Sequence, residues 1–238
     1  MAVPTNLFQK ASLKGDREDL IDKIYNTSPT ETPVLSAVGR VSATNTYHEW
    51  QRDALATANK DNALIDGDDV TLDAQTATER VGNYMQIFAK KPGVSRRANI
   101  VKKAGRGSEL AYIKAKSMLE IKRDIEAMIV SANAAVAPTT AVAGKSGGLG
   151  VQNNANTEHG AGGSTAAWTS GAPTTAPTAG TGRAFTEALL KSAVQKTYIA
   201  SGEVPRMVIM SPNHKGVFSG FVGIAVNRYQ VSKKEQGR

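Results

Sequence analysis

SELAYIKAKSMLEIKRDIEAMIVSAN, residues 108–133, is the longest regular pattern in the chain and decides how the rest is interpreted. Ser108 can cap a helix, and Glu109 falls in its first turn, where a carboxylate suits the helix dipole. Apolar residues recur at spacings of three and four: Met118, Ile121, Ile125, Met128, Ile129 and Ala132. The pattern predicts a spine-like helix about 39 Å long at roughly 1.5 Å per residue. Lys122 and Glu126 have the spacing of an ion pair on its surface.

Two stretches of β-forming residues precede this helix, at 46–55 and 81–89. The residues between them are polar and rich in Asp, and Asp66-Gly67 supplies turn chemistry. Two strands that flank a long acidic tip predict an extended β-loop that projects from the body of the protein.

Four further helices are predicted from apolar periodicity and capping residues, at 16–25, 33–38, 185–199 and 213–220. Met207–Met210 is a continuous apolar run typical of a buried strand. Residues 134–182 are rich in Ala, Gly, Thr, Ser and Pro, and their only charges are Lys145 and Glu158. This composition indicates a loop, an insertion or a disordered segment.

The net charge of +8 over 238 residues is unevenly distributed. Residues 53–79 hold seven acids and one base, whereas residues 80–108 hold eight bases and no acid. Such blocks of like charge are ordinarily solvated surface. The more specific interpretation is that identical copies of the chain dock, with the acidic block of one copy on the basic block of another. The candidate contact residues are Asp66, Asp68, Asp69, Asp73, Arg96, Arg97, Lys102, Lys103 and Arg106.

No catalytic, cofactor or metal site is predicted. The chain has no cysteine, which excludes disulfides, thiol catalysis and iron–sulfur clusters. His48, His159 and His214 share no metal-ligand spacing. Residues 144–148 fit G-x-S-x-G and partly resemble a phosphate-binding loop, but their flanks lack the strand and helix that either motif needs. The acidic cluster lacks the spacing of a calcium-binding loop.

The composition also restricts the class of partner. No stretch has the length and apolarity of a membrane-spanning helix or a signal peptide, so we expect a soluble protein made in the cytoplasm. The basic block matches no nucleic-acid-binding motif, although non-specific phosphate contact needs only positive charge. A non-specific basic nucleic-acid-binding protein is therefore the alternative to a self-assembling one.

Several stretches in order resemble a family of tailed-bacteriophage major head (capsid) proteins, from about residue 16 to residue 229. They are DLIDKIYNTSPTETP at 19–33, TNTYHEWQ at 44–51, GSELAY at 107–112, KRDIEA at 122–127 and SPNHKGVFSGF at 211–221. No single one of them is diagnostic, whereas the ordered series is fairly specific.

The resemblance implies an α+β protein with the Hong Kong 97 type of capsid fold. The implied parts are an N-terminal arm at 1–45, an extended β-loop and flanking peripheral-domain segment at 46–105, a spine helix at 106–135, a Gly/Ala/Thr-rich loop or insertion at 136–182, and an axial-domain portion at 183–238. Members of such families usually continue well beyond the equivalent of Tyr229. The resemblance therefore implies either a longer chain or a different closure of the core.

The function implied is structural, with no enzyme activity and no cofactor. Copies of the chain would form the pentamers and hexamers of an icosahedral head, built in the host cytoplasm, that encloses double-stranded DNA. Portal, scaffolding and decoration proteins would be further partners of the virion, and the packaged DNA would be contacted through non-specific charge.

Overall fold

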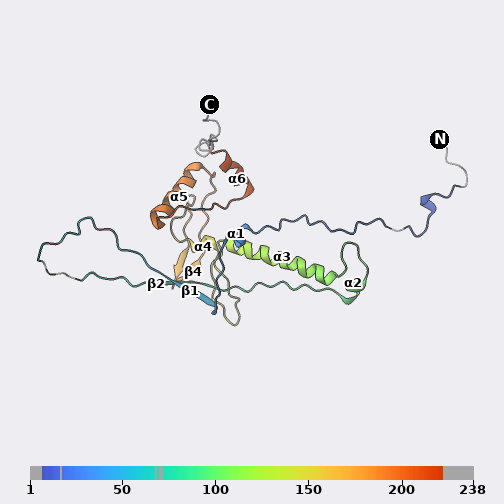
Figure 1. The fold of residues 1–238 in the computed structure, drawn as a ribbon, viewed down its shortest axis with the longest axis horizontal. Helices are drawn as coiled ribbons and strands as arrows, with labels where there is room; N and C mark the ends of the chain where they lie inside the picture. The colour runs from blue at the N-terminus through green and yellow to red at the C-terminus, as the bar shows by residue number, and fades with distance from the viewer. Residues whose placement is uncertain (1–6, 17, 68, 70–71, 222–238) are drawn as a thin grey trace, which may run out of the picture. The chain divides into compact units, whose positions relative to one another are not determined.

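The structure is a computed structural model that describes residues 7–16, 18–67, 69 and 72–221. It contains helices and short antiparallel strands, so the predicted α+β class is confirmed (Figure 1). The chain divides into two compact units. The first comprises Met1–Glu31 and Ala89–Ile121, and the second comprises Thr32–Phe88 and Lys122–Arg238.

The long helix predicted at 108–133 is confirmed as α3, Glu109–Val130. Side chains accept hydrogen bonds from backbone N–H groups in the first turn of this helix. The Ser108 hydroxyl accepts the N–H of Ala111 (3.3 Å), and the Asn99 side chain accepts the N–H of Leu110 (3.2 Å). These contacts explain where the helix begins, because the first turn of a helix has no backbone acceptors of its own.

Glu126 on α3 has a different role from the one its spacing predicts. Its two carboxylate oxygens accept the backbone N–H groups of Val34 (2.9 Å) and Leu35 (2.7 Å) at the start of α1, Pro33–Ala37. An anion at a helix N-terminus is favourable because that end carries partial positive charge. Glu126 therefore fastens α1 to α3. The predicted ion pair between Lys122 and Glu126 is wrong.

The first unit contains η1 (Lys10–Ser12), α2 (Arg96–Ile100) and the first turns of α3. The helix predicted at 16–25 is wrong, since the described residues of this stretch are extended. Asp22 accepts the backbone N–H of Gly105 at 2.7 Å, and Ile24 packs against the same glycine. These tertiary contacts hold the chain extended despite its helical pattern.

In the second unit, β1 (Tyr47–Arg52) pairs antiparallel with β2 (Glu79–Tyr84). The register runs from Tyr47 opposite Tyr84 to Arg52 opposite Glu79, and the two tyrosine rings lie 4.7 Å apart. Both predicted strands are thus confirmed, although β1 is shorter than predicted at both ends and β2 starts and ends earlier than predicted. The described residues among the 26 that separate β1 from β2 form neither helix nor strand.

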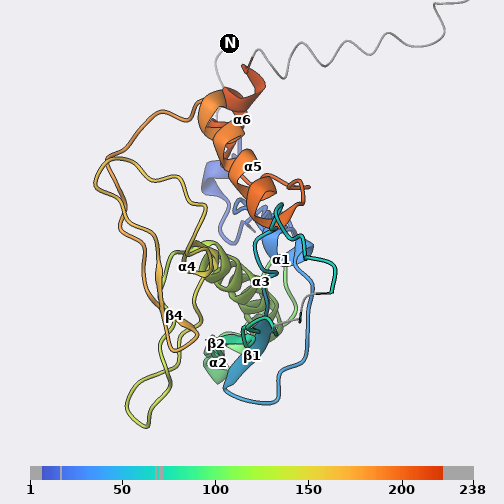
Figure 2. The ribbon, with the colours of Figure 1, turned by 90° about the vertical axis from the view of Figure 1, so that its left-hand side faces the viewer.

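Residues 134–182 carry more structure than their composition predicts. They contain α4 (Leu149–Gln152) and a hairpin of β3 (Ala167–Thr169) and β4 (Ala172–Thr175). The stretches that lead to and from this hairpin run side by side in Figure 2, and a bridge joins Ser164 to Thr178. Buried apolar residues of the second unit, four of them from this segment, are Val34, Val81, Ala135, Val151, Ala166 and Ala172.

The C-terminal elements are α5 (Glu187–Ser201) and α6 (Pro212–Ser219), which confirm two predicted helices. Gly202 ends α5 in a left-handed conformation (φ 71°), as expected of a C-terminal glycine. The strand predicted at Met207–Met210 is wrong. This run is largely exposed and pairs with no strand among the described residues.

Among the described residues, no helix combines the length and apolarity needed to cross a membrane.

Candidate functional site

The acidic block forms most of the loop between β1 and β2. In Figure 1 this loop extends well away from the ribbon that carries it. Asp66, Asp69 and Asp73 are exposed along it, and Asp68 lies outside the described residues. Gly67 has φ +84°, the left-handed conformation that the predicted Asp66-Gly67 turn requires.

Cross-strand contacts hold the base of this loop. Arg52 pairs with Glu79 (2.8 Å), and Arg80 pairs with Glu49 (2.6 Å). The Arg52 guanidinium also lies 5.7 Å from the centre of the Trp168 ring, on β3. Opposite charges placed across a ladder support its register. The loop therefore leaves a defined ribbon whose charges are already balanced.

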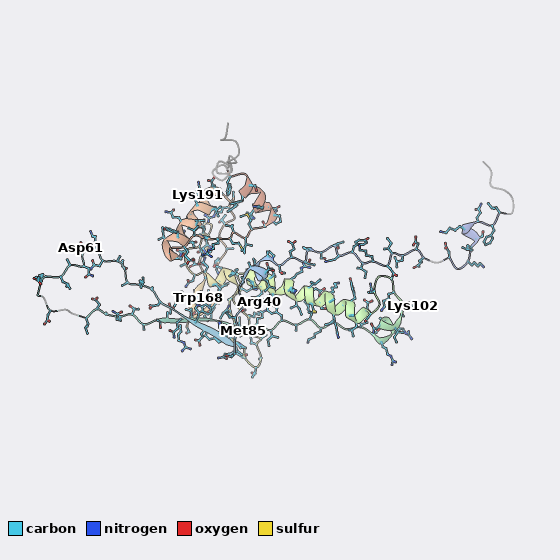
Figure 3. The ribbon with its side chains drawn as sticks, viewed as in Figure 1. Arg40, Asp61, Met85, Lys102, Trp168 and Lys191 are labelled. Carbon is cyan, nitrogen blue, oxygen red and sulfur yellow. The ribbon has the colours of Figure 1, made fainter. Side chains whose placement is uncertain are left out.

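The basic block divides into two groups. Arg96 and Arg97 lie exposed on α2, whose first turn is capped by the Ser95 hydroxyl, an acceptor for the N–H of Ala98 (3.2 Å). Lys102 is exposed in the turn that follows. Figure 3 labels Lys102 at this position, between α2 and α3. These three cations are presented to solvent.

The other two candidate cations, Lys103 and Arg106, converge on Glu109. The Arg106 Nε and Lys103 Nζ atoms lie 2.5 and 3.7 Å from the Glu109 carboxylate. The hydrogen bond from Arg106 is the main reason that the pKa of Glu109 lies below its ordinary value, and Lys103 adds to the effect. Both cations thus share one carboxylate within their own unit, and the cluster keeps a net charge of +1. The sequence carried a signal for this contact, because Arg106 and Glu109 are three residues apart.

The G-x-S-x-G stretch at 144–148 has a structural role. The Ser146 hydroxyl donates to the carbonyl oxygen of Tyr84 (2.8 Å), and its N–H donates to the Gln86 side chain (3.2 Å). The Asn83 side chain both accepts from and donates to the backbone of Gly147. The serine therefore anchors this segment to β2 and the residues after it. Within the described part of the chain, no group of three or more His, Cys, Asp and Glu side chains is arranged to hold a metal ion.

Glu158 is a residue whose role the sequence does not reveal. Its carboxylate accepts from the Ser192 hydroxyl (2.6 Å) and pairs with Lys196 (2.7 Å) and Arg183 (3.4 Å). Hydrogen bonds from Lys196 and Ser192 lower the pKa of Glu158 to about 2. Ser192 and Lys196 belong to α5, so this carboxylate fastens α5 to the Gly/Ala/Thr-rich segment.

The depressed pKa of Glu158 predicts a specific acid sensitivity. Because its folded-state pKa lies below the ordinary 4.5, its contribution to stability is complete above that pH and is lost as the pH falls toward about 2. The Glu158→Gln variant should unfold at lower urea concentration than the wild type at pH 6, and the difference should vanish near pH 2. Urea unfolding followed by circular dichroism checks this. A difference that is constant across the pH range would contradict the assignment.

The described residues thus present exposed charges of opposite sign, acidic on the loop between β1 and β2 and basic on α2. Residues 3–237 match the family described as SU10 major capsid protein. The chain therefore belongs to the SU10 major capsid protein family.

A curated relative is the major capsid protein of Escherichia phage Phieco32. It is 37% identical to this chain over 134 residues, which make up 56% of this chain and 38% of the relative. The match therefore spans well under half of the relative's length.

Family membership confirms the expected class. Major capsid proteins are structural components of the virion and not enzymes, and the resemblance to tailed-phage major capsid proteins is confirmed.

Proposed function

We propose that this chain is the repeating subunit of an icosahedral phage head that encloses double-stranded DNA. Its parts would follow the Hong Kong 97 arrangement, with an arm at 1–45, an extended β-loop in 46–105, a spine at 106–135, a loop or insertion at 136–182 and an axial portion at 183–238. The observation that carries this proposal is the exposed acidic loop on its charge-balanced ribbon, since such a projection suits contact with another copy.

The shell would assemble from pentamers and hexamers of the chain in the host cytoplasm. Acidic residues of the loop would face basic residues of a neighbouring subunit. Exposed ion pairs contribute only about 0–1 kcal/mol each, so these charges would mainly set register while apolar contacts supply affinity. Remaining positive charge would contact the packaged DNA, and portal, scaffolding or decoration proteins would complete the head.

Electron microscopy of the purified protein tests this proposal against its alternative. A capsid subunit should form shells or capsomers. A non-specific nucleic-acid-binding protein would instead form small oligomers, with a DNA affinity that falls steeply as salt rises. Small oligomers with that salt dependence would overturn the capsid proposal.

Charge reversal at Arg96 and Arg97 tests the docking role of the basic surface. The double variant Arg96→Glu/Arg97→Glu should lower particle yield about tenfold or more. Each docking contact would lose two ion pairs of up to about 1 kcal/mol and gain repulsion between like charges, and about 1.4 kcal/mol in total is already a factor of ten. Particle yield after sedimentation is the measurement, and circular dichroism should show an unchanged fold. The matched control is Lys114→Glu/Arg123→Glu, which changes charge equally at two exposed positions of α3. An equal loss in both variants would indicate a general charge effect.

A further inference from the structure

We infer that the acidic loop of one copy docks on the α2 corner of a second copy through two adjacent apolar side chains. The α2 corner is defined as residues 96–102. The apolar anchors are Leu64 and Ile65 on the loop, and their counterparts are Ile100 and Val101 on the corner. This inference rests on the proposed function and names the surface that the loop recognises.

The loop side is an apolar pair set among acids. Leu64 and Ile65 are 72% and 78% exposed, between Asp61 and Asp66. Figure 3 labels Asp61 on this loop, far out from the ribbon. Two adjacent large apolar side chains presented to water mark an interaction site more often than isolated ones do.

The corner has the same pattern with the opposite charge. Ile100 and Val101 are 70% and 57% exposed, and the cations Arg96, Arg97 and Lys102 flank them. Lys103 and Arg106 are less available to a partner, because their side chains are only 15% and 32% exposed and both turn toward the Glu109 carboxylate. The structure thus reduces the five candidate cations to three, and these three surround an apolar pair.

The two surfaces complement each other in charge and in apolar character. Burial of the four side chains would supply affinity, because removing apolar surface from water is favourable. The surrounding acids and bases would set orientation and exclude the reverse docking. Both surfaces belong to this chain, and capsid subunits are present in many copies, so the partner that fits is a second copy of the same chain.

Disulfide trapping tests this pairing cleanly, because the chain contains no cysteine. Ile65→Cys and Ile100→Cys chains are co-expressed, particles are purified, and a mild oxidant is applied before non-reducing electrophoresis. A covalent dimer should form when both variants are present, at a level at least tenfold above either variant alone. The matched control pairs Leu55→Cys with Ile100→Cys, since Leu55 is also apolar and at least as exposed as Ile65 but lies near the base of the loop.

Each outcome is decisive. Normal particles without the covalent dimer would overturn the docking pair and leave the capsid proposal intact. Equal dimer yields with Leu55→Cys would also overturn it, since position along the loop would not matter. The double variant Ile65→Cys/Ile100→Cys should give covalent multimers, and a predominantly intrachain bond would show that the loop docks on its own chain. Absence of both particles and dimers would reject the docking and the capsid proposal together.

Discussion

Replacing Gly148 by alanine should lower the free energy of unfolding by about 3 kcal/mol, near the upper end for an overpacked site. A Cβ atom at this position would collide with the carbonyl oxygen of Ser131 and lie 2.7 Å from that of Met128. Both are backbone atoms at the end of α3, so neither can rotate away as a side chain would. The N–H of Gly148 also donates to the Asn133 carbonyl (3.2 Å), which keeps the two backbones together.

Urea unfolding followed by circular dichroism measures this effect, and Gly182→Ala is the matched control. Gly182 lies in the same Gly/Ala/Thr-rich segment and has no atom within 4 Å of an added Cβ. The control should stay within about 0.5 kcal/mol of the wild type, as ordinary surface substitutions do. Equal stabilities of the two variants would show that the end of α3 has room for a side chain.

The second large effect is expected at Glu126. Glu126→Ala should destabilise the protein by about 2–3 kcal/mol, because it removes two charge-assisted hydrogen bonds. It also leaves the N–H groups of Val34 and Leu35 without their acceptor, and Val34 is only 2% exposed. Glu126→Gln should lower the free energy of unfolding by less than Glu126→Ala, because the glutamine amide keeps one acceptor oxygen.

Glu120→Ala is the matched control for Glu126→Ala, since both change glutamate to alanine on α3. Among the described residues, Glu120 pairs with the exposed Lys116 at 3.9 Å near the surface of α3, so its removal should cost less than about 1 kcal/mol. Thermal and urea unfolding of both variants provide the comparison. If Glu120→Ala were the more damaging change, the carboxylate would not be what fastens α1 to α3.

Elements with complete local signals were predictable from the sequence. The helices α3 and α6 combine apolar periodicity with capping residues, and their starts fall within a residue or two of the predicted ones. Thr186 similarly accepts the N–H of Leu189 at the start of α5, and Gly202 ends that helix. Such contacts involve neighbours in the chain, so local sequence is enough to specify them.

Elements that depend on distant partners were not predictable in the same way. The 16–25 stretch has a helical pattern, but Gly105, some eighty residues away, holds it extended. Met207–Met210 has strand-forming residues, but a strand also needs a hydrogen-bonded neighbour. Residues 134–182 look featureless because small residues give no periodic signal, although close backbone approach such as that at Gly148 requires them.

The candidate site likewise has features that the sequence predicts and features that only the structure shows. The charge blocks are visible in the sequence, and the structure keeps Arg96, Arg97 and Lys102 exposed as a surface needs. The count of charges by segment misses the contact of Lys103 and Arg106 with Glu109, because Glu109 lies just beyond the block at 80–108. Net charge by segment therefore overstates the positive charge that a partner can meet.

The ribbon of β1 and β2 also limits how far the acidic loop can reach. Both ends of the loop are tied at the Arg52–Glu79 pair, so its 26 residues must go out and return. Thirteen residues fully extended span at most about 45 Å. Any surface that the tip touches must lie within that radius of the pair. The ribbon thereby sets an upper bound on the spacing of subunits joined through this loop.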